Sequence, residues 1–300
     1  MAHNLAYQFK SAIDSNFKEG TEKRSYKAVN GRKATGKIFS YAQRKDLIET
    51  SNNFAKYIKH TYPEVRKISD VRSEHVNSYL ESKLGTCTSA TIHQYATRLE
   101  KLQHVANGHF KTANATWKVT VPHIETVKMR DVAFSRQDYS NVMNSGSDCQ
   151  SYRALDLAGR FGLRAQEVVK IRTTDIDYNN RTLHITGKGG RERYLPMRES
   201  DIGVLKEYTG RLRPGERLFT VKSDSVNSYL NRTCKNLGIE RYAKCKSGVH
   251  AIRKMVAQER YDELREAGAT KEEALTYVNN YLGHGDHRPD ISNTYIENQW

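Results

Sequence analysis

Two short motifs in the C-terminal half of the sequence place an arginine beside another polar side chain. Arg164 and Glu167 are three residues apart in a Gly-Leu-Arg-Ala-Gln-Glu segment, and His250 and Arg253 are three apart in His-Ala-Ile-Arg. Residues at this spacing share one face of a helix. Guanidinium groups bind phosphate oxygens in a planar, bidentate manner, and an imidazole can accept a proton near neutral pH. Either pair alone is more typical of an ordinary surface contact, so the rest of the chain must decide.

Three further residues complete a set that could act on a phosphodiester. Lys188 lies in a Gly-Lys-Gly-Gly turn, His284 follows Leu-Gly, and Tyr295 lies near the end of the sequence. A free phenol has a pKa of about 10 and is a poor nucleophile at neutral pH, so a tyrosine nucleophile needs a neighbouring base or dense positive charge. The order of these elements carries more information than any one of them.

In this order the elements resemble those of the tyrosine recombinases, the family of phage integrases, Xer resolvases and Cre. The resemblance extends from about Phe134 to Tyr295, and more loosely over the helical region before it. It implies a nucleophilic tyrosine that attacks DNA inside a cage of cationic side chains. The catalytic residues that it implies are Arg164, Lys188, His250, Arg253, His284 and Tyr295, with Glu167 in support.

The resemblance also implies a role for each residue. Arg164 and Arg253 would hold the non-bridging oxygens, and His250 would accept the proton of the attacking tyrosine. Lys188 would protonate the departing 5′ oxygen, and His284 would donate a hydrogen bond to the phosphate. Glu167 would orient Arg164 or His250. The product would be a 3′-phosphotyrosyl bond that stores the energy needed for rejoining.

We expect no cofactor and no metal. The cationic side chains would replace a divalent ion, and the sequence shows neither a magnesium-binding carboxylate cluster nor a nucleotide-binding glycine loop.

Two positions leave alternatives open. Tyr295 follows His284 by eleven positions (295 minus 284), a longer loop than is usual in the family. His287 is therefore an alternative contact for the phosphate. Tyr277 and Tyr281 are alternative nucleophiles, although they precede the histidine within a helical pattern that favours packing.

The composition is consistent with an intracellular protein that binds DNA. The 300 residues include 49 Lys and Arg against 34 Asp and Glu, a formal net charge of +15 that favours a polyanionic partner. The cysteines are scattered and indicate neither a zinc site nor a disulfide framework; they are Cys87, Cys149, Cys234 and Cys245. The sequence shows no signal peptide and no apolar run long enough to span a membrane. We expect a cytoplasmic location.

The hydrophobic pattern predicts a mainly α-helical protein with one small antiparallel β-sheet. The domains that we expect are a basic N-terminal arm (1–39), a helical DNA core-binding domain (40–110), a linker (111–132) and a catalytic domain (133–300). In the core-binding domain, helical periodicity begins at Ser40 and ends at Pro63, and a later helix follows Thr88. In the catalytic domain we expect helices from about 135, 225, 249 and 271, and a hairpin over 182–197.

Basic residues outside the cage are candidates for contacts to the DNA backbone. Between Lys18 and Lys45 basic residues outnumber acidic ones and glycines are interspersed, which is typical of a flexible arm. The DNA-binding residues that we expect are Lys33, Lys37 and Arg44 in or near this arm, and Arg191 and Arg193 in the hairpin.

These features together predict a site-specific recombinase that integrates or excises a mobile element. We expect it to close on double-stranded DNA as a C-shaped clamp and to form a homo-tetramer on paired sites, with possible accessory DNA-bending or directionality proteins and no membrane partner. A non-catalytic DNA-binding relative and a nicking-rejoining topoisomerase are the alternatives.

Overall fold

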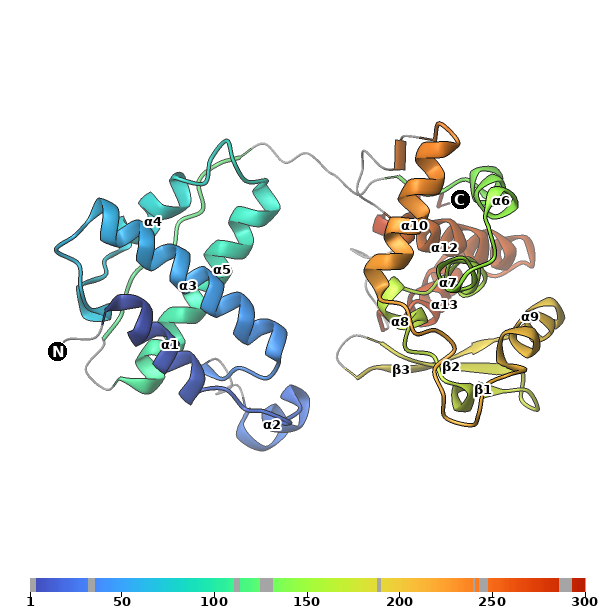
Figure 1. Cartoon of the computed structure of the whole chain (residues 1–300), viewed down its shortest axis with the longest axis horizontal. Helices are drawn as coiled ribbons and strands as arrows, with labels where there is room; N and C mark the ends of the chain where they lie inside the picture. The colour runs from blue at the N-terminus through green and yellow to red at the C-terminus, as the bar shows by residue number, and fades with distance from the viewer. Residues whose placement is uncertain are drawn as a thin grey trace. The chain divides into compact units, whose positions relative to one another are not determined.

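The computed structural model describes residues 4–31, 36–110, 114–124, 132–187, 190–239, 241–242, 248–285 and 293–299. It is mainly α-helical with one small antiparallel sheet, which confirms the predicted fold class. The chain divides into two compact units, Met1–Val127 and Lys128–Trp300 (Figure 1).

The first unit is a bundle of helices. They are α1 (Leu5–Ser15), α2 (Lys23–Asn30), α3 (Tyr41–Thr61), α4 (Ser73–Glu81) and α5 (Ser89–His109), with a short 3₁₀ helix at Ile68–Asp70. Hydroxyl caps fix where two of them begin, because Ser40 accepts a hydrogen bond from the Gln43 amide and Thr88 accepts one from the Thr91 amide. The helices α3 and α5 are those that the hydrophobic periodicity predicts.

The predicted N-terminal arm is wrong for residues 5–15. This segment forms α1, which packs against α3 and α5 and buries Leu5, Phe9, Ala12 and Ile13 in the core of the unit. These positions are spaced four, three and one apart, which is the pattern of one helical face. The basic residues of the predicted arm begin only at Lys18, after this helix has ended.

The predicted linker is wrong for residues 114–121. Trp117 is 4% exposed, packs edge-on against Phe9, and its carbonyl accepts a hydrogen bond from Gln103. Backbone amides at 118 and 120 donate to Ser73 and Asn77. The segment lacks helical periodicity because it runs as extended chain over the bundle, where a large aromatic side chain fills the core.

The second unit holds the predicted hairpin among helices. The helices are α6 (Arg136–Ser145), α7 (Gln150–Phe161), α8 (Ala165–Val168), α9 (Glu199–Thr209), α10 (Ser223–Asn236), α12 (Val249–Glu266) and α13 (Lys271–Tyr281). The strands are β1 (Ile176–Asp177), β2 (Thr182–Thr186) and β3 (Glu192–Pro196), in the order β1-β2-β3. In the hairpin Leu183 pairs with Leu195, and both are buried. The two-residue strand β1 is too short for a sequence pattern to reveal.

Helix α7 lies at the centre of this unit and contacts α6, α8, α10 and α12. It ends at Gly162, whose φ of +60° is a left-handed conformation that favours glycine. A Cβ atom here would lie 3.1 Å from Val256 of α12, so the glycine also allows close packing. This turn delivers the chain directly to Arg164 at the start of α8.

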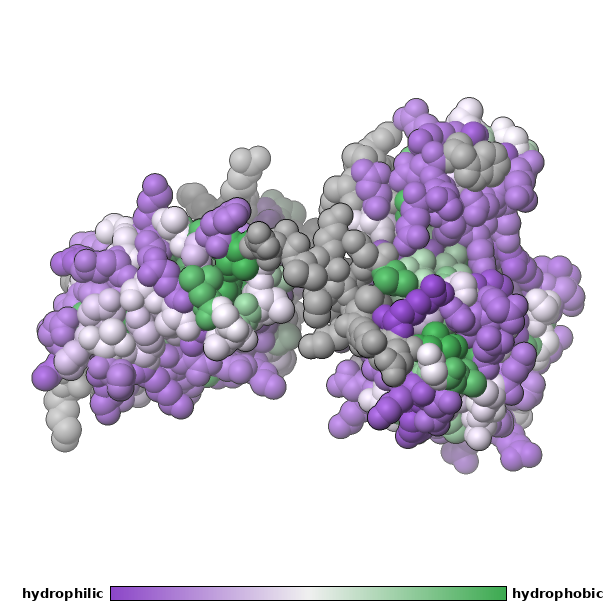
Figure 2. All heavy atoms as spheres, turned by 90° about the horizontal axis from the view of Figure 1, so that it is seen from above, coloured by the Kyte–Doolittle hydropathy of each residue, from purple (hydrophilic) through white to green (hydrophobic). Residues whose placement is uncertain are grey.

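On the face that Figure 2 shows, most of the coloured residues are hydrophilic, with small hydrophobic patches between them. No helix within the described parts of the chain combines the length and the apolar composition that a membrane span requires.

We predict that Trp117→Ala destabilises the first unit. Removing a large buried aromatic side chain leaves a cavity, and the free energy of unfolding should fall by about 3–5 kcal/mol in urea titrations. Val29→Ala, at a position that is 85% exposed, should change it by less than about 0.5 kcal/mol. Equal stability of Trp117→Ala and the parent would show that this segment is a linker after all.

Candidate active site

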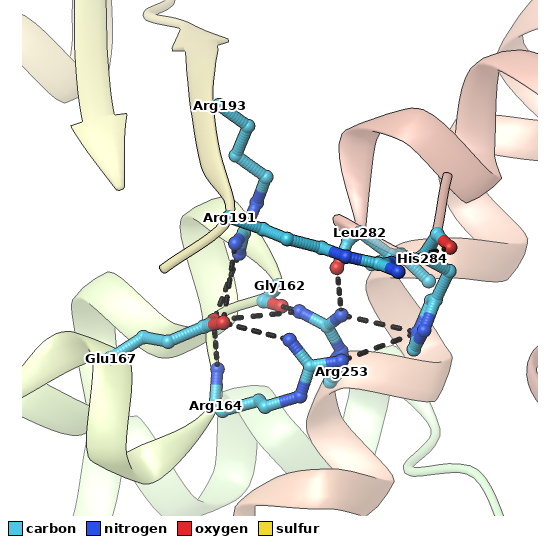
Figure 3. A network of polar contacts seen from close by, with 8 residues as sticks. All are labelled: Gly162, Arg164, Glu167, Arg191, Arg193, Arg253, Leu282 and His284. Carbon is cyan, nitrogen blue, oxygen red and sulfur yellow. Dashed lines mark hydrogen bonds and ion pairs between the residues drawn. The ribbon is translucent and has the colours of Figure 1, made fainter. Parts of the chain in front are cut away.

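Three arginines from three parts of the second unit form ion pairs with one buried carboxylate, that of Glu167 (Figure 3). Glu167 is the third residue of α8, and its Oε2 accepts a hydrogen bond from the backbone amide of Arg164, 3.0 Å away, at the N-cap. Its Oε1 accepts a second bond from Nη1 of Arg164 at 2.7 Å. The i, i+3 spacing seen in the sequence thus gives a helix cap and an ion pair together.

Arg193 and Arg253 complete this cluster. Arg193 of β3 donates to both oxygens of Glu167, at 2.8 and 3.2 Å, and Nη1 of Arg253 lies 3.7 Å from Oε2. Burial opposes ionisation of Glu167, but the hydrogen bonds and charge of Arg193, the charge of Arg253 and the bond from Arg164 outweigh it. Together they lower the pKa of Glu167 to about 2. The carboxylate is therefore ionised at neutral pH.

Arg253 is completely buried and holds two chain turns together. Its Nη1 donates to the Gly162 carbonyl at 2.6 Å, and its Nη2 donates to the Leu282 carbonyl at the end of α13. Burial and then the charge of Arg164 lower the pKa of Arg253 to about 10, which leaves it protonated at neutral pH. This side chain fixes the ends of α7 and α13, the two places from which Arg164 and His284 extend.

His284 lies against both arginines of the cage. Its Nε2 is 3.4 Å from Nη2 of Arg164 and 3.4 Å from Nη2 of Arg253. Because arginine can only donate, Nε2 acts as the acceptor in these long contacts, which assigns the ring proton to Nδ1. The backbone carbonyl of His284 accepts a bond of 2.8 Å from Nη1 of Arg191, so the residue that precedes β3 is joined to the turn that follows α13.

Tyr295 packs among three of the predicted site residues. Its ring centroid is 5.0 Å from that of His250 and 5.0 Å from that of His284. The guanidinium carbon of Arg253 lies 5.5 Å from the same ring, within the range of a cation–π contact. The structure thus brings together Arg164, His250, Arg253, His284 and Tyr295, and Glu167 is bonded to Arg164.

Several predicted residues lie elsewhere or outside the described parts of the chain. Lys33, Lys188 and His287 fall in segments that the structure does not describe. The alternative tyrosines, Tyr277 and Tyr281, stack on each other in α13, where Arg260 lies over the ring of Tyr281. Tyr281 is buried in the core of the unit, whereas Tyr277 is 41% exposed.

The expectation that Arg193 contacts DNA is wrong. Its side chain is 8% exposed and is bonded to Glu167 beneath the site. The alternation of β3 carries the signal that was missed, since Arg193 shares the inward face with the buried Leu195. In the first unit, Lys37 donates to Asn16 at 2.8 Å and Arg44 pairs with Asp14. Both are therefore engaged within the unit, although Arg44 is partly exposed.

The cage borders a cavity of about 490 Å³ between α8 and the hairpin. Arg164, Lys170, His184 and Gly187 contribute to its lining. Within this lining the guanidinium of Arg164 is partly exposed and Lys170 is exposed. Within the described residues, no group of three or more His, Cys, Asp or Glu lies close enough together to hold a metal ion.

Comparison with known proteins is consistent with this geometry. Residues 133–298 match the model of the phage integrase family. The putative integrase/recombinase y4rA of Sinorhizobium fredii is 29% identical over 170 residues, which are 51% of this chain and 38% of that protein. Tyrosine recombinase XerC of Chlamydia trachomatis is 36% identical over 83 residues, 28% of this chain and 25% of that protein. The chain thus matches less than half the length of these curated relatives.

Two solved structures share the fold over nearly the whole chain. The XerH site-specific recombinase bound to a palindromic difH substrate has a TM-score of 0.69 at 16% identity, covering 97% of this chain and 90% of that one. A lambda integrase tetramer bound to a Holliday junction has a TM-score of 0.60 at 14% identity, covering 100% and 80%. At such identities the likeness shows the fold alone.

We predict that Glu167→Gln removes the charge that balances the arginines. Leaving buried cations without their partner should lower the free energy of unfolding at pH 7 by about 3–5 kcal/mol. Glu199→Gln is the matched control, because its pair with Arg181 is exposed at both ends and should contribute less than about 1 kcal/mol.

The difference in the free energy of unfolding between the parent and Glu167→Gln should also depend on pH. The pKa of Glu167 is lowered in the folded state from 4.5 to about 2, so its contribution is complete above pH 4.5 and is lost as the pH falls through 2. The gap between parent and Glu167→Gln should therefore narrow between pH 5 and pH 2. A gap that is absent at pH 7, or constant across this range, would contradict the assignment.

Proposed function

The chain belongs to the phage integrase family of tyrosine recombinases, and from this we propose that it cleaves and rejoins DNA strands at specific sites through a 3′-phosphotyrosyl intermediate. The observation that carries the proposal is the packing of Tyr295 against His250, His284 and Arg253. A tyrosine buried merely for packing has no need of two imidazoles and a guanidinium around its ring.

In the proposed reaction the phenol oxygen of Tyr295 attacks the scissile phosphorus. A bond forms between that oxygen and phosphorus, the bond from phosphorus to the 5′ oxygen breaks, and His250 takes the phenolic proton. Arg164 and Arg253 stabilise the charge that develops on the non-bridging oxygens. When phosphate enters, the two guanidinium groups exchange their long contacts to Nε2 of His284 for contacts to oxygen. The ring proton can then move to Nε2, the tautomer in which His284 donates a hydrogen bond to the phosphate.

Lys188 supplies the proton that the departing 5′ oxygen needs. The strands on either side of it, β2 and β3, end beside the cage, and Arg191 ties this end to His284. Rejoining is the reverse reaction, in which a 5′ hydroxyl attacks the phosphotyrosine and returns the phenol. Recombination follows when that hydroxyl comes from a second duplex.

We propose double-stranded DNA and further copies of the chain as partners. The net charge of +15 supports a polyanionic partner, and a relative of the same fold is a tetramer on a Holliday junction. A homo-tetramer on two paired sites would bring four tyrosines to the strands that must be exchanged. Integration or excision of a mobile element, assisted by accessory DNA-bending proteins, is the proposed biological role.

The direct test is a covalent complex with DNA. A duplex site is first selected from a random pool by binding to the protein, and a nick beside the scissile phosphate then traps the cleaved strand. The parent and Tyr277→Phe should form a complex that resists denaturation, whereas Tyr295→Phe should form none. A complex that persists in Tyr295→Phe would remove the proposed nucleophile, and its absence in the parent would favour a DNA-binding relative without catalysis.

A further inference from the structure

The chain that follows Tyr295 is fixed to α12 by one side chain, that of Gln258. Its Oε1 accepts hydrogen bonds from the backbone amides of Glu297 and Asn298, at 2.9 and 3.1 Å. Its Nε2 donates to the Asn298 carbonyl at 2.9 Å and to Oδ1 of Asp262 at 3.0 Å. Both acceptor positions and both donor hydrogens of the amide are used, so its orientation is fixed.

The helix that carries this amide also carries two residues of the cage. Gln258 lies eight residues after His250 (258 minus 250), roughly two turns along α12. His250 and Arg253 contact the ring of Tyr295 from the same helix. The first anchored residue, Glu297, is two positions beyond Tyr295, and the intervening Ile296 is 2% exposed. Little chain remains between the anchor and the nucleophile.

Tyr295 and Ile296 anchor this segment by burial in the core, and Lys271 and Gln299 make further hydrogen bonds in it. Nζ of Lys271, an exposed residue, donates to the Gln299 carbonyl at 3.1 Å, and the Gln299 amide bonds to Asn293 and to the Ile296 carbonyl. The bonds of the Gln299 side-chain amide are internal to residues 293–299. Gln258 contributes three of the hydrogen bonds that join this segment to the rest of the unit.

We propose that Gln258 is a positioning residue for Tyr295. By holding the backbone at 297 and 298, its amide keeps the phenol against His250 and Arg253 of the same subunit. The inference rests on the proposed function, since it assigns Gln258 a part in placing that nucleophile.

Loss of this amide should lower the reaction rate but leave the thermal stability nearly unchanged. The bonds of Gln258 to residues 297 and 298 lie at the protein surface, so water can replace them. The position of the phenol is more demanding, because a misplacement of about 1 Å can cost about 100-fold in rate.

The experiment uses the full chain and the selected, nicked duplex at saturating concentration. In Gln258→Ala the single-turnover rate of covalent complex formation should fall by about 10- to 100-fold. The Kd for DNA and the midpoint of thermal unfolding should stay close to those of the parent. Gln150→Ala is the matched control, since Oε1 of Gln150 likewise accepts two bonds, from the amide and hydroxyl of Thr220, in another part of the unit.

Exchanging the amide of Gln258 with the carboxylate of Asp262 tests the hydrogen bonds themselves. In the double variant Gln258→Glu, Asp262→Asn, the new carboxylate accepts from both backbone amides and from the new amide, but no donor remains for the Asn298 carbonyl. The double variant should therefore recover part of the rate lost in Gln258→Ala. Gln258→Glu alone places two carboxylates side by side and should recover less.

The outcomes distinguish this inference from the proposed function. If the parent forms the covalent complex and Gln258→Ala forms it equally fast, the positioning role is wrong. It is also wrong if Gln258→Ala loses rate, DNA affinity and thermal stability together and the double variant restores none of them. If the parent forms no complex at all, the proposed function fails, and the inference falls with it.

Discussion

The buried carboxylate of Glu167 is the constraint on which the site depends. Guanidinium groups lose hydration when they are brought together out of water, and several in one place repel each other. Glu167 offsets part of this cost by accepting bonds from Arg164 and Arg193 and by lying 3.7 Å from Arg253. Three cations less one anion leave an excess of two positive charges. Such a cluster is electrostatically completed by a phosphate whose negative charge grows during attack.

The arginine contacts that join separate elements of the second unit also position the residues of the candidate site. Arg253 ties the end of α7 to the end of α13 through the carbonyls of Gly162 and Leu282. Arg193 brings the hairpin onto α8, and Arg191 connects it to the backbone of His284. Because these contacts come from separate elements, the cage can form only when the whole unit is packed. A site fixed in this way is preorganised, so little reorganisation is required at the moment of reaction.

Local sequence patterns predicted the features that depend on neighbouring residues, namely individual helices and the hairpin. Hydrophobic periodicity and hydroxyl caps located α3 and α5, and the glycine turn located the β2-β3 hairpin. The candidate site was found because its residue types occur in a recognisable order along the chain. What the sequence did not reveal depends on distant contacts. Trp117 belongs to a core only because Phe9 lies opposite it, and Arg193 is buried only because Glu167 reaches it from α8. A polar residue on an inward strand face was mistaken for a surface residue because its partner lies 26 positions away.

The central claim is that Tyr295, placed by this cage, becomes bonded to DNA. The most direct measurement is to digest the trapped covalent complex and to identify by mass spectrometry the peptide that carries the nucleotide. The account predicts that the nucleotide is attached at Tyr295. Attachment at Tyr281, Tyr277 or any other residue would contradict it.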